Sequence, residues 1–413
     1  MEYTIERLGH QGDGIARSAD FGPVFAPRTL PGEVIAGEVS GNRIEVPRII
    51  VPSSDRVTPP CTHYKACGGC ALQHARDTFV ADWKVDVVRQ ALAAQGIEAP
   101  LSGPDTSPPN SRRRATLSGR RTKKGALVGF HGRASGVITE IGGCHLLHPG
   151  ILAGMPAFQA IVTQHGSRKG ELGLAVTWSK AGLDVTVSGG KPLDGPLRMA
   201  LAGLADAHDL ARLVWEDEVI VTRRAPTHAM GPAKVTPPPG AFLQATVEGQ
   251  AALTAAVLRA VGDARRVADL FSGCGTFALP LAQKAEVHAV ESVADMLAAM
   301  DRGWRTAQGL KRLTHARRDL FRRPLLPDEL AAFDAVVIDP PRAGAEAQMR
   351  NLAMAKVPVI AAVSCNPVTF ARDARILSDS GYVLDWVQVV DQFRWSPHVE
   401  LAARFHRSHI AQA

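Results

Sequence analysis

The sequence lacks the features that would place it in a membrane or a secretory pathway. Met1 is followed by acidic and polar residues, without the basic and apolar stretches of a signal peptide. The longest apolar runs, such as Val357 to Val363, are far too short to span a bilayer. Internal repeats and low-complexity tracts are also absent. We therefore expect a cytoplasmic protein of ordinary packed domains with no membrane association.

Cysteine is scarce, with six residues in a chain of 413. In a reducing compartment these residues should be thiols, so a cluster of them indicates metal binding or catalysis before disulfides. A hydrophobic fraction of 46% is enough to form cores, and the length predicts two or three domains. The formal net charge of +7 fits a polyanionic partner without establishing one.

The first half of the chain divides into two segments. Residues 1–52 alternate apolar and polar residues between glycine turns such as Gly12-Asp13-Gly14, which predicts a small β-barrel. Residues 53–235 begin with a cysteine-rich stretch and an expected helix from Thr78 to about Gln95. Strands and turns follow, including a hairpin formed by residues 176–178 and 183–187. We expect a mixed α+β central domain in this second segment.

In residues 236–413 the sequence pattern changes, after a break at Pro237 to Gly240, to alternating helices and short apolar strands. An alanine-rich helix is expected at residues 246–261. Short apolar runs of the buried parallel-strand type follow at 267–271, 287–290, 335–338 and 359–363. This order of elements predicts a C-terminal α/β domain with a doubly wound, Rossmann-like sheet.

A glycine loop, Gly273-Cys274-Gly275, lies between the strand at 267–271 and an expected helix. Glycines let the backbone approach a ligand closely, and a helix N-terminus adds a favourable dipole. Glu291 ends the next strand, where its carboxylate can accept hydrogen bonds from both ribose hydroxyls of a nucleoside cofactor. The pattern predicts a nucleotide-type cofactor but does not by itself distinguish NAD from S-adenosyl-L-methionine (SAM).

The end of a later strand favours SAM. Asp339-Pro340-Pro341 follows the strand at 335–338 and would form a rigid rim beside the cofactor crevice. Amino-group methyltransferases place an Asn or Asp followed by Pro-Pro at this point to hold a planar base. The combination with the upstream glycine loop therefore indicates a SAM-dependent methyltransferase domain.

Two further residues are candidates for catalysis. Cys365 follows another apolar strand, between Ser364 and Asn366-Pro367, and these polar neighbours argue against a core position. A cysteine thiolate is strongly nucleophilic and also a good leaving group, so we predict Cys365 as a covalent nucleophile. In Ser396-Pro397-His398-Val399-Glu400 we predict Glu400 as the general base, with His398 as the alternative.

Four cysteines form a candidate metal site. Cys61, Cys67 and Cys70 lie close together in the sequence, and Cys144 stands alone in Gly142-Gly143-Cys144-His145. Four such ligands hold either zinc or an iron–sulfur cluster, and the spacing alone does not choose between the two.

Together these motifs resemble the RNA (uracil-5-)-methyltransferase family, especially its branch that acts on 23S ribosomal RNA, over nearly the whole chain. Residues 12–17 and 30–33 resemble the TRAM module of that branch, an OB-like RNA-binding barrel. The resemblance implies that the four cysteines hold a [4Fe-4S] cluster. Phe242-Leu243-Gln244 resembles the Phe-x-Gln motif of the family, whose Gln lies at the SAM pocket.

The same resemblance implies SAM contacts at Gln244, Phe271, Glu291 and Asp339, with Cys365 as nucleophile and Glu400 as base. Two positions depart from the family pattern. The family usually has Cys at the position of Ser272 and Asn at that of Thr276, so Thr276 is a weaker candidate for a cofactor contact.

The implied reaction transfers the methyl group of SAM to carbon 5 of a uridine in RNA. The thiolate of Cys365 would add to carbon 6 and make carbon 5 nucleophilic, and Glu400 would then remove the carbon 5 proton. The base must be flipped out of the RNA fold or lie in a loop. We expect a monomer acting on 23S rRNA, with the phosphate contacts Arg112, Arg113, Arg114, Arg120, Arg121, Lys123 and Lys124.

The sequence leaves several alternative functions to compare with uridine methylation of 23S rRNA. The same reaction on tRNA is the first alternative. An RNA-binding protein without activity is disfavoured, because Cys365, Asp339 and Glu400 are all present. An NAD-dependent oxidoreductase would use the glycine loop alone. RNA cytosine-5 methyltransferases typically carry a Pro-Cys nucleophile motif, which this sequence lacks at Cys365.

Overall fold

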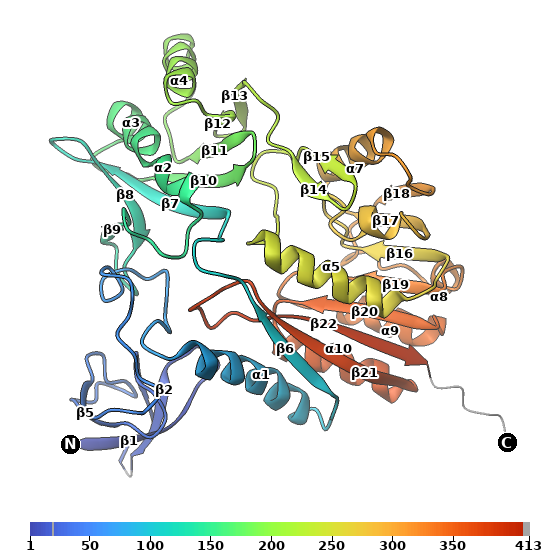
Figure 1. Cartoon of the computed structure of the whole chain (residues 1–413), viewed down its shortest axis with the longest axis horizontal. Coiled ribbons are helices and arrows are strands. Elements are labelled where there is room, and N and C mark those ends of the chain that lie inside the picture. Colours follow the sequence, from blue (N-terminus) through green and yellow to red (C-terminus); the bar gives the residue numbers. More distant parts are fainter. Residues whose placement is uncertain (19, 408–413) are drawn as a thin grey trace.

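The computed structural model describes residues 1–18 and 20–407, which form three large sheets and one two-stranded ribbon (Figure 1). The N-terminal sheet has the strand order β3-β2-β1-β4-β5, and all its neighbours are antiparallel. Its strands are β1 (Glu2–Leu8), β2 (Gly14–Ser18), β3 (Gly22–Ala26), β4 (Val34–Ala36) and β5 (Arg48–Val51). The β-structure predicted for residues 1–52 is confirmed, and its closure into a barrel stays a prediction.

The central sheet has the strand order β13-β12-β11-β10-β7-β8-β9. Its strands are β7 (Arg114–Arg121), β8 (Ala126–His131), β9 (Ile138–Glu140), β10 (Leu172–Ser179), β11 (Gly182–Ser188), β12 (Arg212–Trp215) and β13 (Glu218–Thr222). Its helices are α2 (Pro149–Ala153), α3 (Met155–His165) and α4 (Gly195–Ala207). The predicted hairpin is confirmed as the antiparallel pair β10–β11. The ribbon of β14 (His228–Met230) and β15 (Ala233–Val235) then leads to the C-terminal part.

The third sheet has eight strands in the order β18-β17-β16-β19-β20-β22-β21-β6. Its strands are β6 (Leu101–Thr106), β16 (Arg266–Leu270), β17 (Glu286–Glu291), β18 (Leu313–Arg317), β19 (Ala335–Ile338), β20 (Val359–Ser364), β21 (Tyr382–Asp391) and β22 (Glu400–Arg407). The five strands from β18 to β20 are parallel, and β22 runs antiparallel to both of its neighbours. The predicted doubly wound α/β fold is therefore confirmed.

Helices cover both faces of this eight-stranded sheet. They are α1 (Asp77–Ala93), α5 (Val247–Val261), α6 (Ala278–Leu281), α7 (Ala294–Thr306), α8 (Pro327–Leu330), α9 (Glu346–Ala355) and α10 (Pro367–Asp379). Leu270 of β16 belongs to the core cluster that includes residues of α1, α9 and α10. Val267 of the same strand belongs to the cluster that includes residues of α5, α6 and α7. Alternate strand residues thus face opposite helical layers, as a sheet buried on both faces requires.

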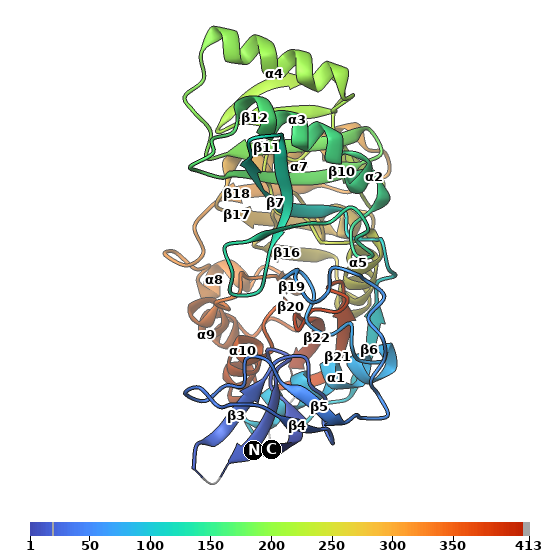
Figure 2. The same cartoon turned by 90° about the vertical axis from the view of Figure 1, so that its left-hand side faces the viewer.

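The N-terminal half contributes directly to this sheet. Helix α1 packs against α10 and β21, and β6 pairs with β21 in parallel (Figure 1). The chain therefore enters the eight-stranded sheet, leaves it to form the central sheet and then returns. The N-terminal sheet and the central sheet lie at opposite ends of the molecule in Figure 2. None of the helices in the described residues has the length and apolar character needed to cross a membrane.

Candidate active site

The glycine loop begins where β16 ends. Phe271, Gly273 and Gly275 have φ angles of 62°, 55° and 89°. This left-handed region is uncommon for a residue other than glycine, so the backbone at Phe271 is strained. A Cβ atom on Gly275 would lie 2.7 Å from Cγ of Met300, which explains glycine at that position. The helix that follows, α6, has only four residues, so the expected dipole contribution is small.

A cavity of about 430 Å³ opens above this loop. It is lined by all four residues predicted to contact SAM, Gln244, Phe271, Glu291 and Asp339, and also by Thr276, Cys365 and Glu400. The structure thus brings together residues from six separate segments at the carboxyl edge of the parallel strands, where ligands of open α/β sheets bind.

Several residues that line this cavity were not predicted from the sequence, among them Asp319 and Phe321. Asp319 and Phe321 follow β18 and line its wall, and the Phe321 ring centroid lies 5.4 Å from that of Phe271. Strand β18 carries His315 and Arg317 at positions that a fully buried strand would fill with apolar residues. No apolar run therefore marked it. The sequence signal that could have identified this loop is Asp319 itself, an aspartate between a strand and a helix, like Asp339 after β19.

Glu291 connects the glycine loop to the next strand. Its Oε2 accepts a hydrogen bond from the Gly273 N–H at 3.1 Å, and its Oε1 accepts from the N–H groups of Ser292 and Val293 at 2.6 and 2.9 Å. The carboxylate predicted to hold a ribose therefore also fixes the two loops that border the cofactor cavity.

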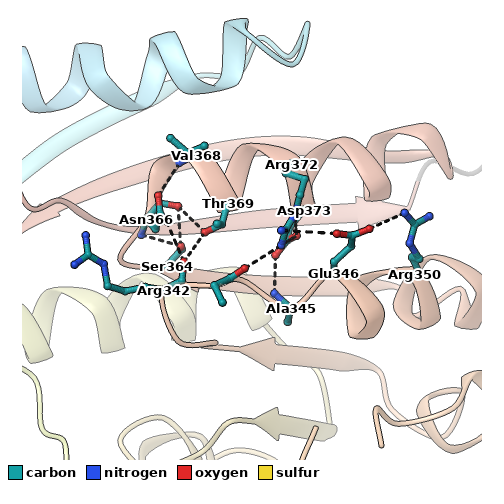
Figure 3. A network of polar contacts seen from close by, with 11 residues as sticks. Arg342, Ala345, Glu346, Arg350, Ser364, Asn366, Val368, Thr369, Arg372 and Asp373 are labelled. Carbon is teal, nitrogen blue, oxygen red and sulfur yellow. Dashed lines mark hydrogen bonds and ion pairs between the residues drawn. The ribbon is translucent and has the colours of Figure 1, made fainter. Parts of the chain in front are cut away.

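Cys365 lies directly after β20, in a loop that its neighbours hold in place. Asn366 caps α10, because its Oδ1 accepts a hydrogen bond from the Val368 N–H at 3.1 Å, and Pro367 is the first helical residue. Asn366 Nδ2 and Thr369 Oγ1 both donate to the carbonyl oxygen of Arg342, at 2.9 and 3.2 Å (Figure 3). The loop that carries Cys365 is thus tied to the loop that carries Asp339 and Arg342.

The electrostatic surroundings of Cys365 are acidic. Burial raises the pKa of Cys365 to about 11, and the carboxylates of Glu400 and Asp339 add to this, while Arg342 opposes it. Burial and the nearby Asp339 raise the pKa of Glu400 to about 8. Burial also raises the pKa of Asp339 to about 7. Two carboxyl groups beside the thiol can therefore change protonation near neutral pH, which suits proton transfer.

His398 and Glu400 face different spaces. Glu400 is 3% exposed and lines the cofactor cavity together with Cys365. His398 is exposed and lines a second, larger cavity of about 910 Å³. This arrangement supports Glu400 over His398 as the base, because only Glu400 shares the cofactor cavity with Cys365.

The second cavity extends from the N-terminal sheet to the edge of the eight-stranded sheet that carries Cys365. It is lined by His10 and Gln11, by Cys70, by the arginines Arg112, Arg133 and Arg342, and by Cys365. Arg133 also forms an ion pair with Asp13, at 2.7 Å, which links the central sheet to the N-terminal sheet. Cys365 and Arg342 line both cavities, so the two spaces meet at the candidate nucleophile.

The three consecutive arginines have different roles. Arg112 lines the large cavity. Arg113 is 4% exposed and donates to the carbonyl oxygen of Gln244 at 3.1 Å and to Oε1 of Gln250 at 2.7 Å. The predicted phosphate contact is therefore wrong for Arg113, because its guanidinium is buried against the linker before α5. Arg114 stacks over the Phe242 ring, 4.7 Å from its centroid.

The four predicted metal ligands meet in the central part of the chain. Cys61, Cys67, Cys70 and Cys144 line one small cavity of about 20 Å³, and none of them forms a disulfide. The sulfur atoms of Cys67 and Cys144 accept backbone hydrogen bonds from Gly69 and Leu146, at 3.3 and 3.4 Å.

Among the residues that the structure describes, no group of three or more His, Cys, Asp or Glu side chains is arranged to hold a single metal ion. A [4Fe-4S] cluster binds each thiolate through a different iron, so its ligands stand further apart than those of one ion. Four thiols around one small cavity with Phe130, Ile141 and Leu146 in its wall fit such a cluster.

Comparisons with known proteins agree with this geometry. A family model described as tRNA (uracil-5-)-methyltransferase matches residues 239–407. An uncharacterized RNA methyltransferase of Brucella suis is 45% identical, with 97% of each chain covered. The 23S rRNA (uracil(1939)-C(5))-methyltransferase RlmD of Halomonas elongata is 32% identical over 97% of this chain and 88% of the relative. The crystal structure of Pyrococcus abyssi tRNA (uracil-54, C5)-methyltransferase superimposes with a TM-score of 0.77 at 21% identity, covering 98% of this chain and 99% of that one, which shows the shared fold.

Proposed function

Because this chain belongs to the RNA (uracil-5-)-methyltransferase family, we propose that it methylates carbon 5 of a uridine in 23S rRNA, with Cys365 as a covalent nucleophile. SAM-dependent methylation of uracil carbon 5 in RNA is the reaction of the family. One observation carries the assignment of the nucleophile: Cys365 lies where the cofactor cavity and the arginine-lined cavity meet. A nucleophile at that junction can reach a base that enters from one side and a methyl donor held on the other.

The residues that line the cofactor cavity support SAM as its ligand. Glu291 presents a carboxylate for the ribose hydroxyls, Phe271 an aromatic face, and Gln244 and Asp339 polar groups near Cys365. Bound SAM supplies the methyl group on a sulfonium centre that leaves as S-adenosylhomocysteine.

The chain's residues act in a fixed order. The Cys365 thiol first loses its proton to solvent, and the thiolate then forms a bond to carbon 6 of the uracil. The electrons of the carbon 5–carbon 6 double bond move to an enolate. Carbon 5 then gains the methyl group and still carries its proton. The Glu400 carboxylate removes that proton, the double bond re-forms, and the sulfur–carbon bond breaks to release the Cys365 thiolate.

The RNA target is supported by the relative that is 32% identical and is named for 23S rRNA. The arginine-lined cavity, which also borders the N-terminal sheet, gives room for a base that is flipped out of a folded RNA. The same reaction on tRNA is the second candidate, because the family model that matches residues 239–407 is named for tRNA.

Mapping of 5-methyluridine in ribosomal and transfer RNA, from cells with and without the gene, tests the target. Loss of one 5-methyluridine from 23S rRNA is the expected result, and loss from tRNA alone would transfer the function to the second candidate. RNA that contains 5-fluorouridine should trap the wild-type enzyme as a covalent complex, because the fluorine cannot be removed as a proton. If neither ribosomal nor transfer RNA that contains 5-fluorouridine forms a covalent complex, the covalent mechanism is contradicted.

For the cysteine site we propose a [4Fe-4S] cluster with a structural role, held by Cys61, Cys67, Cys70 and Cys144. Protein purified without oxygen should then contain about four irons and four sulfides per chain. Colourless protein with stoichiometric zinc would contradict this proposal. Cys144→Ala should lower the iron content, since one ligand of a closed set is lost.

A further inference from the structure

A glutamine that belongs to no recognised motif lies between the cofactor side and the base side of the active site. Gln392 is the first residue after β21, and its side chain is 1% exposed. Its Oε1 accepts a hydrogen bond from the Ala245 N–H at 2.7 Å. Its Nε2 donates to Oε1 of Gln244 at 2.5 Å. Val390, two residues earlier, pairs with Glu400 across β21 and β22, and the Gln392 amide lowers the pKa of the Glu400 carboxyl.

The direction of these hydrogen bonds is fixed by chemistry. A backbone N–H is only a donor, so the atom of Gln392 that faces Ala245 must be the oxygen. The nitrogen of Gln392 carries two N–H groups, and the oxygen of Gln244 accepts one of them. The second N–H is left for the Glu400 carboxylate, whose pKa the Gln392 amide lowers. Since the oxygen of Gln244 is engaged, the amide nitrogen of Gln244 remains as a donor for the cofactor cavity that this residue lines.

The surroundings hold Gln392 in this position. A Cβ atom on Gly249 would lie 2.5 Å from Cβ of Gln392, so glycine in the first turn of α5 leaves the necessary space. The preceding residue, Asp391, forms an ion pair of 2.5 Å with the buried Lys84 of α1, and Lys84 also donates to the Phe393 carbonyl oxygen. Both chain neighbours of Gln392, Asp391 and Phe393, are thus bound to Lys84 of α1, which fixes the backbone on either side of Gln392.

We propose that Gln392 is a positioning residue that sets the donor orientation of Gln244 toward the methyl donor and, with the same amide, holds Glu400 ready to accept the carbon 5 proton. This inference rests on the proposed function, because it takes Gln244 as a SAM contact and Glu400 as the base. It adds that one side chain acts on both, so a single substitution affects cofactor affinity and proton removal together.

The groups that face Glu400 come from three loops. They are Asp339 and Arg342 after β19, Cys365 after β20 and Gln392 after β21. Asp339 raises the pKa of Glu400, and Arg342 and Gln392 lower it. Loss of the Gln392 amide should therefore raise the pKa of Glu400 further. Because the base acts as a carboxylate, the acidic limb of the pH–kcat profile should then move to higher pH.

The test uses the full-length protein with Gln392→Met, which keeps the length but not the hydrogen bonds, and Gln392→Glu, which places a carboxylate against the oxygens of Gln244 and Glu400. Both variants should raise the Kd for SAM, measured by calorimetry without RNA, by roughly tenfold. Both should also move the acidic limb upward by about one pH unit, with the larger shift in Gln392→Glu.

Gln348→Met is the matched control. Gln348 is also 1% exposed, its side chain hydrogen-bonds the backbone of Leu325, and neither residue lines either cavity. This control should lower Tm while leaving the Kd for SAM and the pH limb unchanged. If the Gln392 variants behave in the same way, or if only one of the two readouts moves, Gln392 does not couple the two sides.

Wild-type turnover in the same assay separates this inference from the proposed function. If the wild-type enzyme does not form 5-methyluridine through Cys365, the proposed function fails. If it does, and the Gln392 variants match it in both readouts, the inference about Gln392 alone fails.

Discussion

Two buried carboxylates at the same end of adjacent strands have opposite environments. Asp391 ends β21 and Glu400 begins β22, and they are 1% and 3% exposed. Asp391 has a dedicated cation, Lys84, and also accepts the Phe393 N–H at 3.0 Å. Glu400 instead meets Asp339 and Gln392, and its pKa is raised to about 8. A carboxylate with its own buried ammonium holds two segments together, whereas one that lacks it can exchange a proton near neutral pH.

Glu400→Gln should produce the largest effect and sharpen this contrast. Turnover should fall by about 10²–10⁴, the usual contribution of a general base, because the carbon 5 proton can no longer be removed. Attack and methyl transfer precede that step, so a covalent protein–RNA complex carrying the labelled methyl group should accumulate on a denaturing gel. Cys365→Ala is the control and should give neither complex nor product. Normal turnover of Glu400→Gln would place the base elsewhere, with His398 as the next residue to test.

Lys84→Met should affect stability. Removing the ammonium leaves Asp391 buried without its partner, which should lower the free energy of unfolding by about 3–5 kcal/mol in urea titrations. Lys84→Met combined with Asp391→Asn should recover part of this loss, because the unpaired charge is then removed as well. The matched control is Arg89→Met, in the same helix, where an exposed pair with Asp86 should contribute at most about 1 kcal/mol. Equal losses of unfolding free energy in Lys84→Met and Arg89→Met would show that the buried pair is no more important to stability than the exposed pair.

The stability of the protein should depend on pH through Glu400. Its pKa in the folded state, about 8, lies above its ordinary value of 4.5. Its contribution is therefore fully present below about pH 4.5 and is lost as pH rises toward 8. Thermal unfolding from pH 5 to 8.5 should show a Tm that decreases more steeply in wild-type protein than in Glu400→Gln. Asp339, whose pKa of about 7 acts in the same direction, is present in both proteins. Parallel curves would show that the folded state does not favour the protonated form of Glu400.

Arg112→Ala should have the smallest effect, on RNA affinity. Arg112 lines the large cavity, so its loss should weaken RNA binding by roughly tenfold and reduce the dependence of log K on log salt by about one unit. Filter binding at several salt concentrations measures both quantities. Arg350→Ala, on the exposed surface of α9, is the control and should change neither. An unchanged salt dependence for Arg112→Ala would assign this arginine to the structure of the cavity wall.

Parts of the site could be found by local reasoning because their signals are short. Asp339 directly follows an apolar run of four residues, and Cys365 lies one residue beyond a run of five, as expected at the ends of buried strands. Residues at the carboxyl ends of parallel strands meet at one edge, so their proximity follows once the strands are recognised. Asp319 follows β18, which carries polar residues at its exposed positions, and so the same reasoning did not reach it.

Other parts depend on contacts between distant segments. Arg113 looked like its neighbours in sequence, yet it is buried against Gln244 and Gln250, 131 and 137 residues away. Strand β6 has no strong apolar pattern. It pairs with β21, whose backbone N–H and C=O groups would otherwise be unpaired at the edge of the sheet. Neither result has a signal within a short window of sequence, because the partner that decides it lies elsewhere in the chain.

The sequence by itself determined the α/β class, the glycine loop, the motif around Cys365 and the set of four thiols, because each is a local pattern of residue types. The tertiary structure alone decided which polar groups surround them. It placed Lys84 beside Asp391, although the two residues are 307 positions apart in the chain. Glu400, only nine positions from Asp391, instead lies near Asp339 and Gln392. Burial and the sign of the nearest charge set the protonation of a carboxyl group, and both are properties of the packed molecule.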